Sequence, residues 1–243
     1  MDYFYAPPGR IDGRSVIIDG EELAHLVHVM RKKAGDEVMV VDGNGNAHDV
    51  ILEEVTKHSA RGAIRKSFRN YHETEIRVTL AVAILKNPSK FDFLVEKTTE
   101  VGVVGIIPLR TERTIPNHAK TDRWQKLALA AMKQSGRSCL PRVHELTGLE
   151  DLLRTATTFQ SRIIAHSEAP ASPAPPGPIL TGPGPTLILV GPEGGFSEAE
   201  VELCVGEGFK PVYLGDRRLR TETAAIALAT LAILGRGRGT RDL

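Results

Sequence analysis

Apolar runs of strand length alternate with amphipathic stretches of helical period over the C-terminal two thirds of the chain. Near-continuous apolar strands are expected where helices cover both faces of a parallel sheet. The alternation therefore predicts an α/β domain with a mostly parallel sheet. The predicted strands are 76–85, 103–109, 162–165, 187–190 and 211–214, and the helices outside the last strand–helix units are 91–101 and 124–134.

The N-terminal part shows short alternating runs separated by turn residues instead. Strands are predicted at 16–18, 37–41, 47–55 and 61–67. A hairpin turn is expected at Asp42–Gly45, and one helix, 21–30, turns an apolar face toward the strands. These elements predict a small β-barrel. Because the segment 69–75 is polar and aperiodic, it marks the boundary between predicted domains 1–72 and 73–243.

The last fifty residues contain two consecutive strand–turn–helix units. The first turn is Gly191-Pro192-Glu193-Gly194-Gly195, after which Ser197 and Glu200 form a capping box and Gly208 is placed to end the helix. Ligands of open α/β sheets bind beyond the carboxyl ends of the strands. This turn is therefore either a binding loop or an ordinary Gly-Pro turn. It lacks the Lys-Ser or Lys-Thr of a P-loop and the G-x-G-x-x-G spacing, which argues against a phosphate cradle.

The second unit ends in the basic loop 216–220 and an almost wholly apolar helix, 224–234. Thr221 or Thr223 is expected to cap this helix. A helix that is apolar on nearly every side has to be buried, either within one subunit or against a second copy.

Two motifs in this region, LVGPEGGFSEAE and YLGDRRLRTETAAI, resemble the paired C-terminal motifs of the RsmE family within the SPOUT superfamily. The stretch Glu96–Gly102 is similar to that family's K-A-T-E-L-G-V, and Arg123-Trp124 with Gln134–Pro141 is similar to its R-W and E-Q-x-x-R-x-x-x-P stretches. His25–Arg31 resembles its H-x-x-V-L-R segment. Two positions depart from the pattern, Val101 in place of Leu and Lys133 in place of Glu.

The resemblance implies a SPOUT domain with a trefoil knot, preceded by a PUA-like β-barrel that helps to bind RNA. It implies transfer of a methyl group from S-adenosylmethionine to N3 of a uridine in 16S ribosomal RNA, with S-adenosylhomocysteine as the other product. It also implies a homodimer that acts on the small ribosomal subunit. Topology rules alone would argue against a knot.

The candidate cofactor site combines backbone groups that could read an adenine edge with leucines that could bury its faces. The candidate residues are His166, Leu189, Gly191, Pro192, Glu193, Gly194, Gly195, Leu214, Gly215, Leu219, Arg220, Thr221, Thr223 and Ala224.

Methylation at N3 requires loss of the N3 proton and in-line approach of acceptor and donor. Arg220 is the candidate that stabilises negative charge on the carbonyl oxygens. Glu193 or Glu222 is the candidate base. An alternative is that Arg220 pairs with one of these glutamates and only fixes the loop.

Candidate RNA contacts lie in basic clusters and in the motif after the second helix, where a solvated helix end or a contact with a partner subunit is the alternative. They are His25, Arg31, Lys32, Lys33, Arg65, Arg69, Gln134 and Arg137.

Composition limits the remaining possibilities. The chain has 243 residues, 41% of them hydrophobic and 25% charged, which is typical of a globular protein. Its formal net charge of +1 means that any RNA-binding surface has to be local. Cys139 and Cys204 are isolated, which fits a reducing cytoplasm, and His25 and His28 have no partners at metal-ligand spacing, so no metal is expected. No apolar run is long enough to indicate a membrane span.

Two segments stand apart from this pattern. The Pro-rich segment 169–185 is interpreted as a linker or an active-site flap, and the basic tail 236–243 as a frayed end that could touch RNA. Three other functions stay open: ribose 2′-O or guanine N1 methylation, RNA binding without catalysis, and, least supported, a dinucleotide oxidoreductase.

Overall fold

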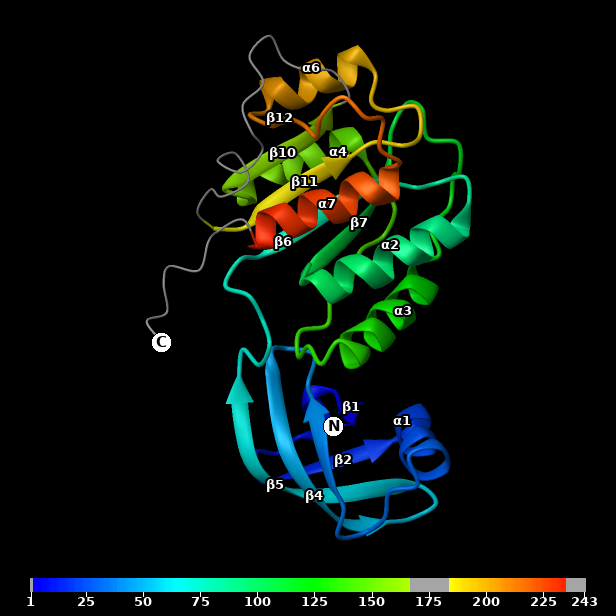
Figure 1. Cartoon of the computed structure of the whole chain (residues 1–243), viewed down its shortest axis with the longest axis vertical. Helices are drawn as coiled ribbons and strands as arrows, with labels where there is room; N and C mark the ends of the chain where they lie inside the picture. The colour runs from blue at the N-terminus through cyan, green and yellow to red at the C-terminus, as the bar shows by residue number, and fades with distance from the viewer. Residues whose placement is uncertain (1, 167–183, 235–243) are drawn as a thin grey trace. The chain divides into compact units, whose positions relative to one another are not determined.

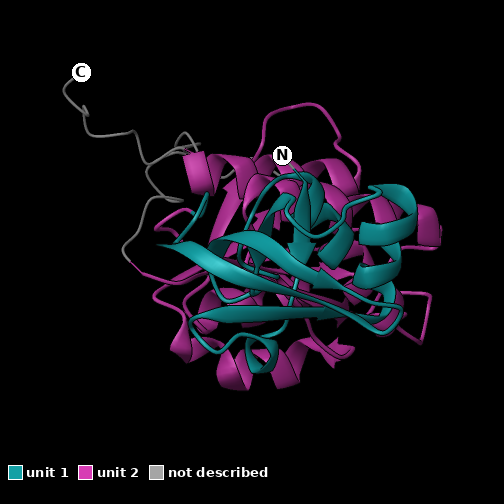
Figure 2. Cartoon of the chain, turned by 90° about the horizontal axis from the view of Figure 1, so that it is seen from below, with its two compact units in different colours: residues 1–73, 129–140 teal, residues 74–128, 141–243 magenta. Residues whose placement is uncertain are grey.

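The computed structural model describes residues 2–166 and 184–234, and the chain divides into two compact units, coloured separately in Figure 2. Unit 1 comprises residues 1–73 and 129–140, and unit 2 comprises residues 74–128 and 141–243. The segment 129–140, which the sequence placed with the C-terminal domain, thus groups with the N-terminal one. The Pro-rich segment 169–185, except Gly184 and Pro185, and the tail 236–243 lie outside the described residues.

Unit 1 is a five-stranded sheet of order β1-β3-β4-β5-β2. Its strands are β1 (Tyr3–Tyr5), β2 (Ser15–Asp19), β3 (Glu37–Val41), β4 (Asn46–Val55) and β5 (Ser59–Arg69). Four of them confirm predicted strands, whereas β1 was not predicted because three residues show no clear period. A short 3-10 turn, Pro8–Arg10, separates β1 from β2.

The predicted helix of unit 1 is present in two parts, α1 (Gly20–Ala24) and a π-helical turn (His25–Val29). Leu23 and Leu26 bury their side chains in a core shared with β2, β3 and β4. The predicted hairpin turn is confirmed between antiparallel β3 and β4. The carboxylate of Asp42 accepts hydrogen bonds from the backbone N–H groups of Asn44 and Asn46, at 2.7 and 3.0 Å, which fixes this turn.

Unit 2 is built on a sheet of order β12-β10-β11-β6-β7-β8, in which every pair of strands is parallel (Figure 1). This confirms the predicted parallel sheet. The strands are β6 (Val78–Ala83), β7 (Gly105–Arg110), β8 (Arg142–Val143), β9 (Thr147–Gly148), which pairs with β7, β10 (Ser161–His166), β11 (Thr186–Val190) and β12 (Lys210–Tyr213).

Helices cover both faces of this sheet, as the apolar strands predicted. The helices are α2 (Pro88–Val101), α3 (Thr121–Gln134), α4 (Leu149–Thr155), followed by a 3-10 turn (Ala156–Thr158), α6 (Glu198–Gly206) and α7 (Thr221–Leu234). Side chains of α4 and α6 pack in one cluster with Leu187 and Leu189 of β11. On the other face, α7 packs against β6, β11 and α2. No described helix has the length and apolar character needed to cross a bilayer.

The start of α7 differs from the prediction. The helix begins at Thr221 itself, and the backbone N–H of Ala224 donates to the carbonyl oxygen of Arg220 at 2.9 Å. Thr221 and Thr223 therefore lie inside the helix and neither is its N-cap. The hydroxyl of Thr221 donates outward instead, to the carbonyl oxygen of Gly191 at 3.0 Å, and so joins α7 to the first loop.

Candidate cofactor-binding site

A cavity of about 390 Å³ lies beyond the carboxyl ends of β10, β11 and β12. These three neighbouring strands are parallel, so their following loops emerge at one edge of the sheet. The cavity is lined by residues of those strands and loops and by the first turns of α6 and α7. They are Ala165, His166, Val190, Gly191, Pro192, Glu193, Gly194, Gly195, Phe196, Val201, Val212, Tyr213, Leu214, Gly215, Asp216, Arg217, Arg218, Leu219, Thr221 and Ala224.

The loop after β11, residues 191–196, is tightly folded. The backbone N–H of Gly195 donates to the carbonyl oxygen of Pro192 at 2.9 Å, and Gly195 has a φ of 69°, which a residue with a Cβ adopts only with strain. A Cβ on Gly191 would lie 3.1 Å from the carbonyl carbon of Gly195 and from the backbone nitrogen of Phe196. Two of the glycines are thus required by the loop itself.

The loop after β12 is tied to the loop after β11. The guanidinium of Arg218 donates to the carbonyl oxygen of Glu193 at 3.3 Å, which adds to the bond from Thr221 to Gly191. Within the second loop, the Tyr213 hydroxyl donates to Asp216 Oδ1 at 2.7 Å. This bond raises the pKa of the Tyr213 phenol above its ordinary value, because only the protonated form donates it.

The lining combines apolar walls with charges of both signs. Val190 and Val212 are buried at the ends of their strands, while Glu193, Arg217 and Arg218 are exposed at the rim. A volume of this size falls within the range typical of small-molecule sites. Among the described residues, no cluster of histidine, cysteine or carboxylate side chains could hold a metal ion.

Known proteins resemble this chain in sequence. A profile of the RNA methyltransferase domain matches residues 72–233 of the chain, and a profile of the RNA methyltransferase PUA domain matches residues 18–64. The ribosomal RNA small subunit methyltransferase E of Bacillus subtilis is 31% identical over 226 residues, 86% of each chain. That of Synechocystis sp. is 31% identical over 93% of this chain and 76% of its own length. The chain belongs to the ribosomal RNA small subunit methyltransferase E family.

Solved structures of this family agree with the fold. A ribosomal RNA small subunit methyltransferase E from Neisseria gonorrhoeae, crystallised with S-adenosylmethionine, superimposes with a TM-score of 0.84. It is 32% identical, and the match covers 94% of this chain and 95% of that one. A chain from Legionella pneumophila in complex with the same cofactor superimposes with a TM-score of 0.79 at 30% identity, over 94% of this chain and 96% of its own. The predicted fold class, a PUA-like domain followed by a SPOUT-type methyltransferase domain, is confirmed, while the knot itself stays a prediction.

Most of the residues predicted from the family motifs to bind cofactor come together at the cavity. His166, Leu214, Gly215, Leu219, Thr221 and Ala224 line it, as do all five residues from Gly191 to Gly195. Three predicted residues do not line it: Leu189, Arg220 and Thr223. Leu189 points into the core cluster with α4 and α6, because successive side chains of a strand face opposite sides of the sheet.

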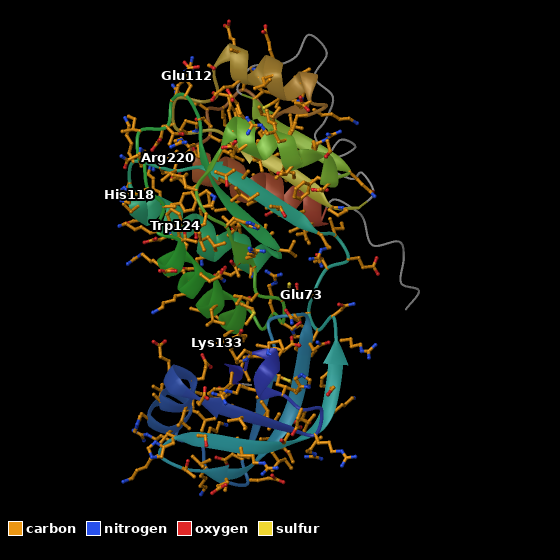
Figure 3. All side chains as sticks on the ribbon, turned by 180° about the vertical axis from the view of Figure 1, so that it is seen from behind. Glu73, Glu112, His118, Trp124, Lys133 and Arg220 are labelled. Carbon is orange, nitrogen blue, oxygen red and sulfur yellow. The ribbon has the colours of Figure 1, made fainter. Side chains whose placement is uncertain are left out.

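The three predicted catalytic residues do not all line the cavity. Glu193 lines the cavity and is exposed, whereas Arg220, labelled in Figure 3, is exposed but is not part of the lining. Glu222 is 8% exposed and its carboxylate lies 3.7 Å from the Lys90 ammonium of α2. Glu222 thus lies outside the lining and faces a cation, and its role as a base stays a prediction. The proposed pairing of Arg220 with a glutamate is not among the ion pairs of the described residues.

The predicted RNA contacts fall into three groups. His25, Arg31, Lys33, Arg69 and Gln134 are exposed. Lys32 and Arg65 pair with Asp2 and Glu37, at 3.2 and 2.6 Å, and remain partly or largely accessible.

Arg137 differs from the other predicted RNA contacts in being buried. It is 3% exposed and donates from Nε and Nη2 to the carboxylate of Glu73 at 3.2 and 2.6 Å. Oε1 of this carboxylate, which accepts from Nε of Arg137, also accepts from the backbone N–H groups of Ser138 and Cys139, at 3.0 and 2.8 Å. Arg137 is therefore part of the interior of unit 1 and is not available to RNA in this conformation. Lys133, the residue that departs from the family pattern, forms an ion pair with Glu22 in the same unit.

The structure also adds lining residues that sequence reasoning missed. Asp216, Arg217 and Arg218 belong to the basic loop that was recognised, but no pattern indicated which of its side chains turn toward the cavity. Phe196 ends the loop 191–196 and Val201 lies in the first turn of α6, so both could have been included from their closeness in the chain to the predicted glycines.

Proposed function

We propose that this protein transfers a methyl group from S-adenosylmethionine to N3 of a uridine in 16S ribosomal RNA of the small subunit and releases S-adenosylhomocysteine. The observation that carries the proposal is the cavity formed by the two motif-bearing loops at the carboxyl edge of the parallel sheet. Membership in the ribosomal RNA small subunit methyltransferase E family supports the substrate class, and the cofactor named for the Neisseria gonorrhoeae relative supports the donor.

The residues of the cavity fit this cofactor. Val190, Val212 and Leu214 offer apolar surface to an adenine ring. The backbone of Gly194, which is exposed, and that of Gly195, which is half-buried, offer hydrogen-bonding groups without side chains in the way. The arginines of the rim can form ion pairs with the carboxylate of a methionine moiety, and the carboxylates of the rim can form ion pairs with its ammonium group.

The chain's own residues have two tasks in the reaction. Bound S-adenosylmethionine supplies an electrophilic methyl group, whose bond to sulfur breaks as its bond to N3 forms. Glu193 and Asp216 are exposed carboxylates of the lining, and Glu193, in the loop after β11, accepts the N3 proton in this proposal. Arg220, at the start of α7, stabilises the negative charge that develops on the uracil carbonyl oxygens.

RNA binding is proposed for the accessible basic residues of unit 1. His25, Arg31, Lys33 and Arg69 are exposed, and Arg65 is exposed beside Glu37. Such contacts with phosphates would make binding strongly dependent on salt, in spite of the near-neutral net charge.

A homodimer is proposed on the basis of α7. One face of this helix is buried on β6, β11 and α2, but another face leaves apolar side chains accessible. Leu231 is 37% exposed and Leu234 is 68% exposed. Together with Thr223, Ala227 and Thr230, these leucines form one stripe of small and apolar residues at helical spacing. A second copy of the chain could bury it.

Two measurements test the proposed function. Calorimetry with S-adenosylmethionine, NAD and ATP should show binding of the first alone, and a protein that binds none of them contradicts the proposal. Methyl transfer to small ribosomal subunits from a strain lacking the enzyme, followed by mass mapping, should place the new methyl group on N3 of a uridine. A methyl group on a ribose 2′-oxygen or on guanine N1 would favour the alternative chemistries.

Variants separate the two catalytic roles. Arg220→Ala should lower kcat by roughly 10² to 10³ with little effect on cofactor affinity. Glu193→Gln should lower kcat by roughly 10² to 10⁴, and less so at alkaline pH, where the N3 proton is lost without help. Retention of full activity in either variant removes that residue from the mechanism.

A further inference from the structure

The loop that follows β7 contains a compact turn, Thr111–Thr114, near the glycine-rich loop. The backbone N–H of Thr114 donates to the carbonyl oxygen of Thr111 at 3.1 Å, and the backbone N–H of Thr111 donates to the Thr114 hydroxyl at 3.0 Å. The two hydroxyl oxygens lie 2.9 Å apart. The turn, which carries the Glu112 labelled in Figure 3, is therefore held in shape by hydrogen bonds among its own residues.

This turn binds the glycine-rich loop through one side chain. Nη1 of Arg113 donates to the carbonyl oxygen of Gly194 at 2.7 Å and to that of Phe196 at 3.3 Å. A Cβ built on Gly194 would lie 3.4 Å from Cδ of Arg113, an ordinary van der Waals distance, so the arginine stem lies beside this part of the loop. Arg113 itself is not part of the cavity lining.

The same turn also binds the start of α6. The backbone N–H of Glu112 donates to Oε1 of Glu200 at 2.8 Å, while Oε2 of Glu200 accepts from the backbone N–H of Ser197 at 2.9 Å. One carboxylate thus completes the capping box of α6 and anchors the turn after β7. Both ends of the segment Gly194–Ser197 are thereby connected to Glu112 and Arg113.

A second arginine approaches the loop from another element. Arg218, in the loop after β12, donates to the carbonyl oxygen of Glu193. Carbonyl groups of three nearby residues, Glu193, Gly194 and Phe196, therefore accept from guanidinium groups that belong to different loops. A loop with two adjacent glycines has many accessible conformations, and fixing it at the moment of ligand binding costs conformational entropy.

We propose that Arg113 is a positioning residue that holds the loop 191–196 in its cofactor-binding conformation before the cofactor arrives. The proposal rests on the proposed function, in which this loop binds S-adenosylmethionine. It goes beyond that function because it gives a role to a residue outside the cavity and to the loop after β7, two strands away from β11 in the sheet. Arg113 acts by preorganisation of the backbone and touches neither cofactor nor RNA.

Arg113→Ala tests the proposal. It should weaken S-adenosylmethionine binding by about tenfold, the loss expected when charge-assisted hydrogen bonds that order a loop are removed. KM for the cofactor should rise by the same factor, while kcat at saturating cofactor should stay within about twofold, because the chemistry does not use Arg113. Arg113→Lys keeps the charge and one possible donor to a carbonyl, and should recover part of the affinity.

Arg154→Ala is the matched control. It removes the same charge from the same unit, at an exposed ion pair with Asp151 on α4. This control should bind cofactor like the wild type. Hydrogen exchange of the cofactor-free proteins gives a second readout, in which the amides of Gly194–Ser197 should exchange faster in Arg113→Ala than in the wild type or the control.

The outcomes distinguish this proposal from the proposed function. If the wild type binds the cofactor and Arg113→Ala binds it equally well, with unchanged exchange of the loop amides, the positioning role is wrong. If the wild type does not bind S-adenosylmethionine, the proposed function fails, and the exchange comparison still decides whether Arg113 orders the loop. A lower melting temperature for Arg113→Ala with equal loop exchange would indicate a general structural role and would also overturn the proposal.

Discussion

Gly191 shows how a single residue limits the shape of the cavity. The Cβ of an alanine there would lie 3.1 Å from backbone atoms of Gly195 and Phe196, which cannot move without opening the loop. We expect Gly191→Ala to weaken S-adenosylmethionine binding by at least about tenfold, measured by calorimetry. Gly206→Ala is the control, because a Cβ at this helical position meets nothing within 4 Å. It should leave binding unchanged and stabilise the fold by roughly 0.5–1 kcal/mol.

His48 provides a pH dependence of stability in unit 1. Burial lowers the pKa of its imidazole below the ordinary 6.5, against a smaller opposing effect of the Asp42 carboxylate. The unfolded chain therefore takes up the proton at a higher pH than the folded one, so stability falls as pH drops from about 6.5 toward the lower folded pKa. The contribution of one such group is at most about 1.4 kcal/mol per pH unit.

His48→Asn should flatten this dependence, because asparagine can approximate the 2.9 Å contact with the Ser67 hydroxyl without titrating. Urea unfolding at pH 7, 6 and 5 measures how the free energy of unfolding depends on pH. His144, whose pKa is also lowered by burial, should leave a residual slope. An unchanged slope in the variant would show that His48 is protonated equally in both states.

The sequence predicts which residues line the cavity well where the backbone conformation of a loop determines the lining. It predicts them poorly where the lining depends on the direction of a side chain. Gly191, Pro192, Gly194 and Gly195 all line the cavity, since they directly follow a buried strand. The burial of Glu222 could not be predicted, because the direction of its side chain depends on where α7 begins, at Thr221 and not at the predicted residue 224. Its partner Lys90 comes from α2, more than a hundred residues away in the chain, so no local sequence pattern predicts this ion pair.

At the scale of elements, the start of α6 is the clearest case of local chemistry. The Ser197 hydroxyl accepts from the backbone N–H of Glu200, and the Glu200 carboxylate accepts from that of Ser197. Ser197→Ala should lower the free energy of unfolding by about 1 kcal/mol, measured by urea denaturation. Ser197→Thr should retain most of the stability, since it keeps a hydroxyl acceptor. Equal loss in both variants would point to packing around the 8% exposed Ser197 side chain rather than to the cap.

Elements with long apolar runs or clear caps were predicted, and short ones were not. The capping box and Gly208 predict both ends of α6. The strands β6 and β11 are buried along their whole length, as their apolar sequences predict. By contrast, β8 and β9 have two residues each, which is too few for any period. The helix α4 carried a usable signal that was overlooked, with Leu149, Leu152 and Leu153 at helical spacing and acidic residues in its first turn.

At the scale of the whole chain, the division into units depends on contacts that a linear pattern does not contain. Residues 129–140 belong to unit 1, although the chain enters them from the methyltransferase domain through α3. Met132 and Leu129 pack with Met39 and Val41, and the Arg137–Glu73 pair lies nearby in the same unit. The sequence showed the amphipathic period of α3, but not that its last turns bury their apolar residues against the N-terminal strands.

The final prediction concerns assembly, and it follows from the accessible stripe on α7. In a twofold dimer each substitution appears twice in one interface, so Leu231→Glu would place two carboxylates there and remove two leucines. Each leucine lost from a buried position costs roughly 1.5–3 kcal/mol, so the dimer should dissociate at least about a hundredfold more readily. Analytical ultracentrifugation measures the dissociation constant of the dimer.

Leu203→Glu, on α6 at a similar 43% exposure, is the control and should stay dimeric. A monomeric wild type, or a Leu231→Glu variant that remains dimeric, would exclude α7 as the interface. If the active site is completed by the second copy, methyl transfer should be lost together with the dimer while the thermal unfolding of the monomer stays cooperative.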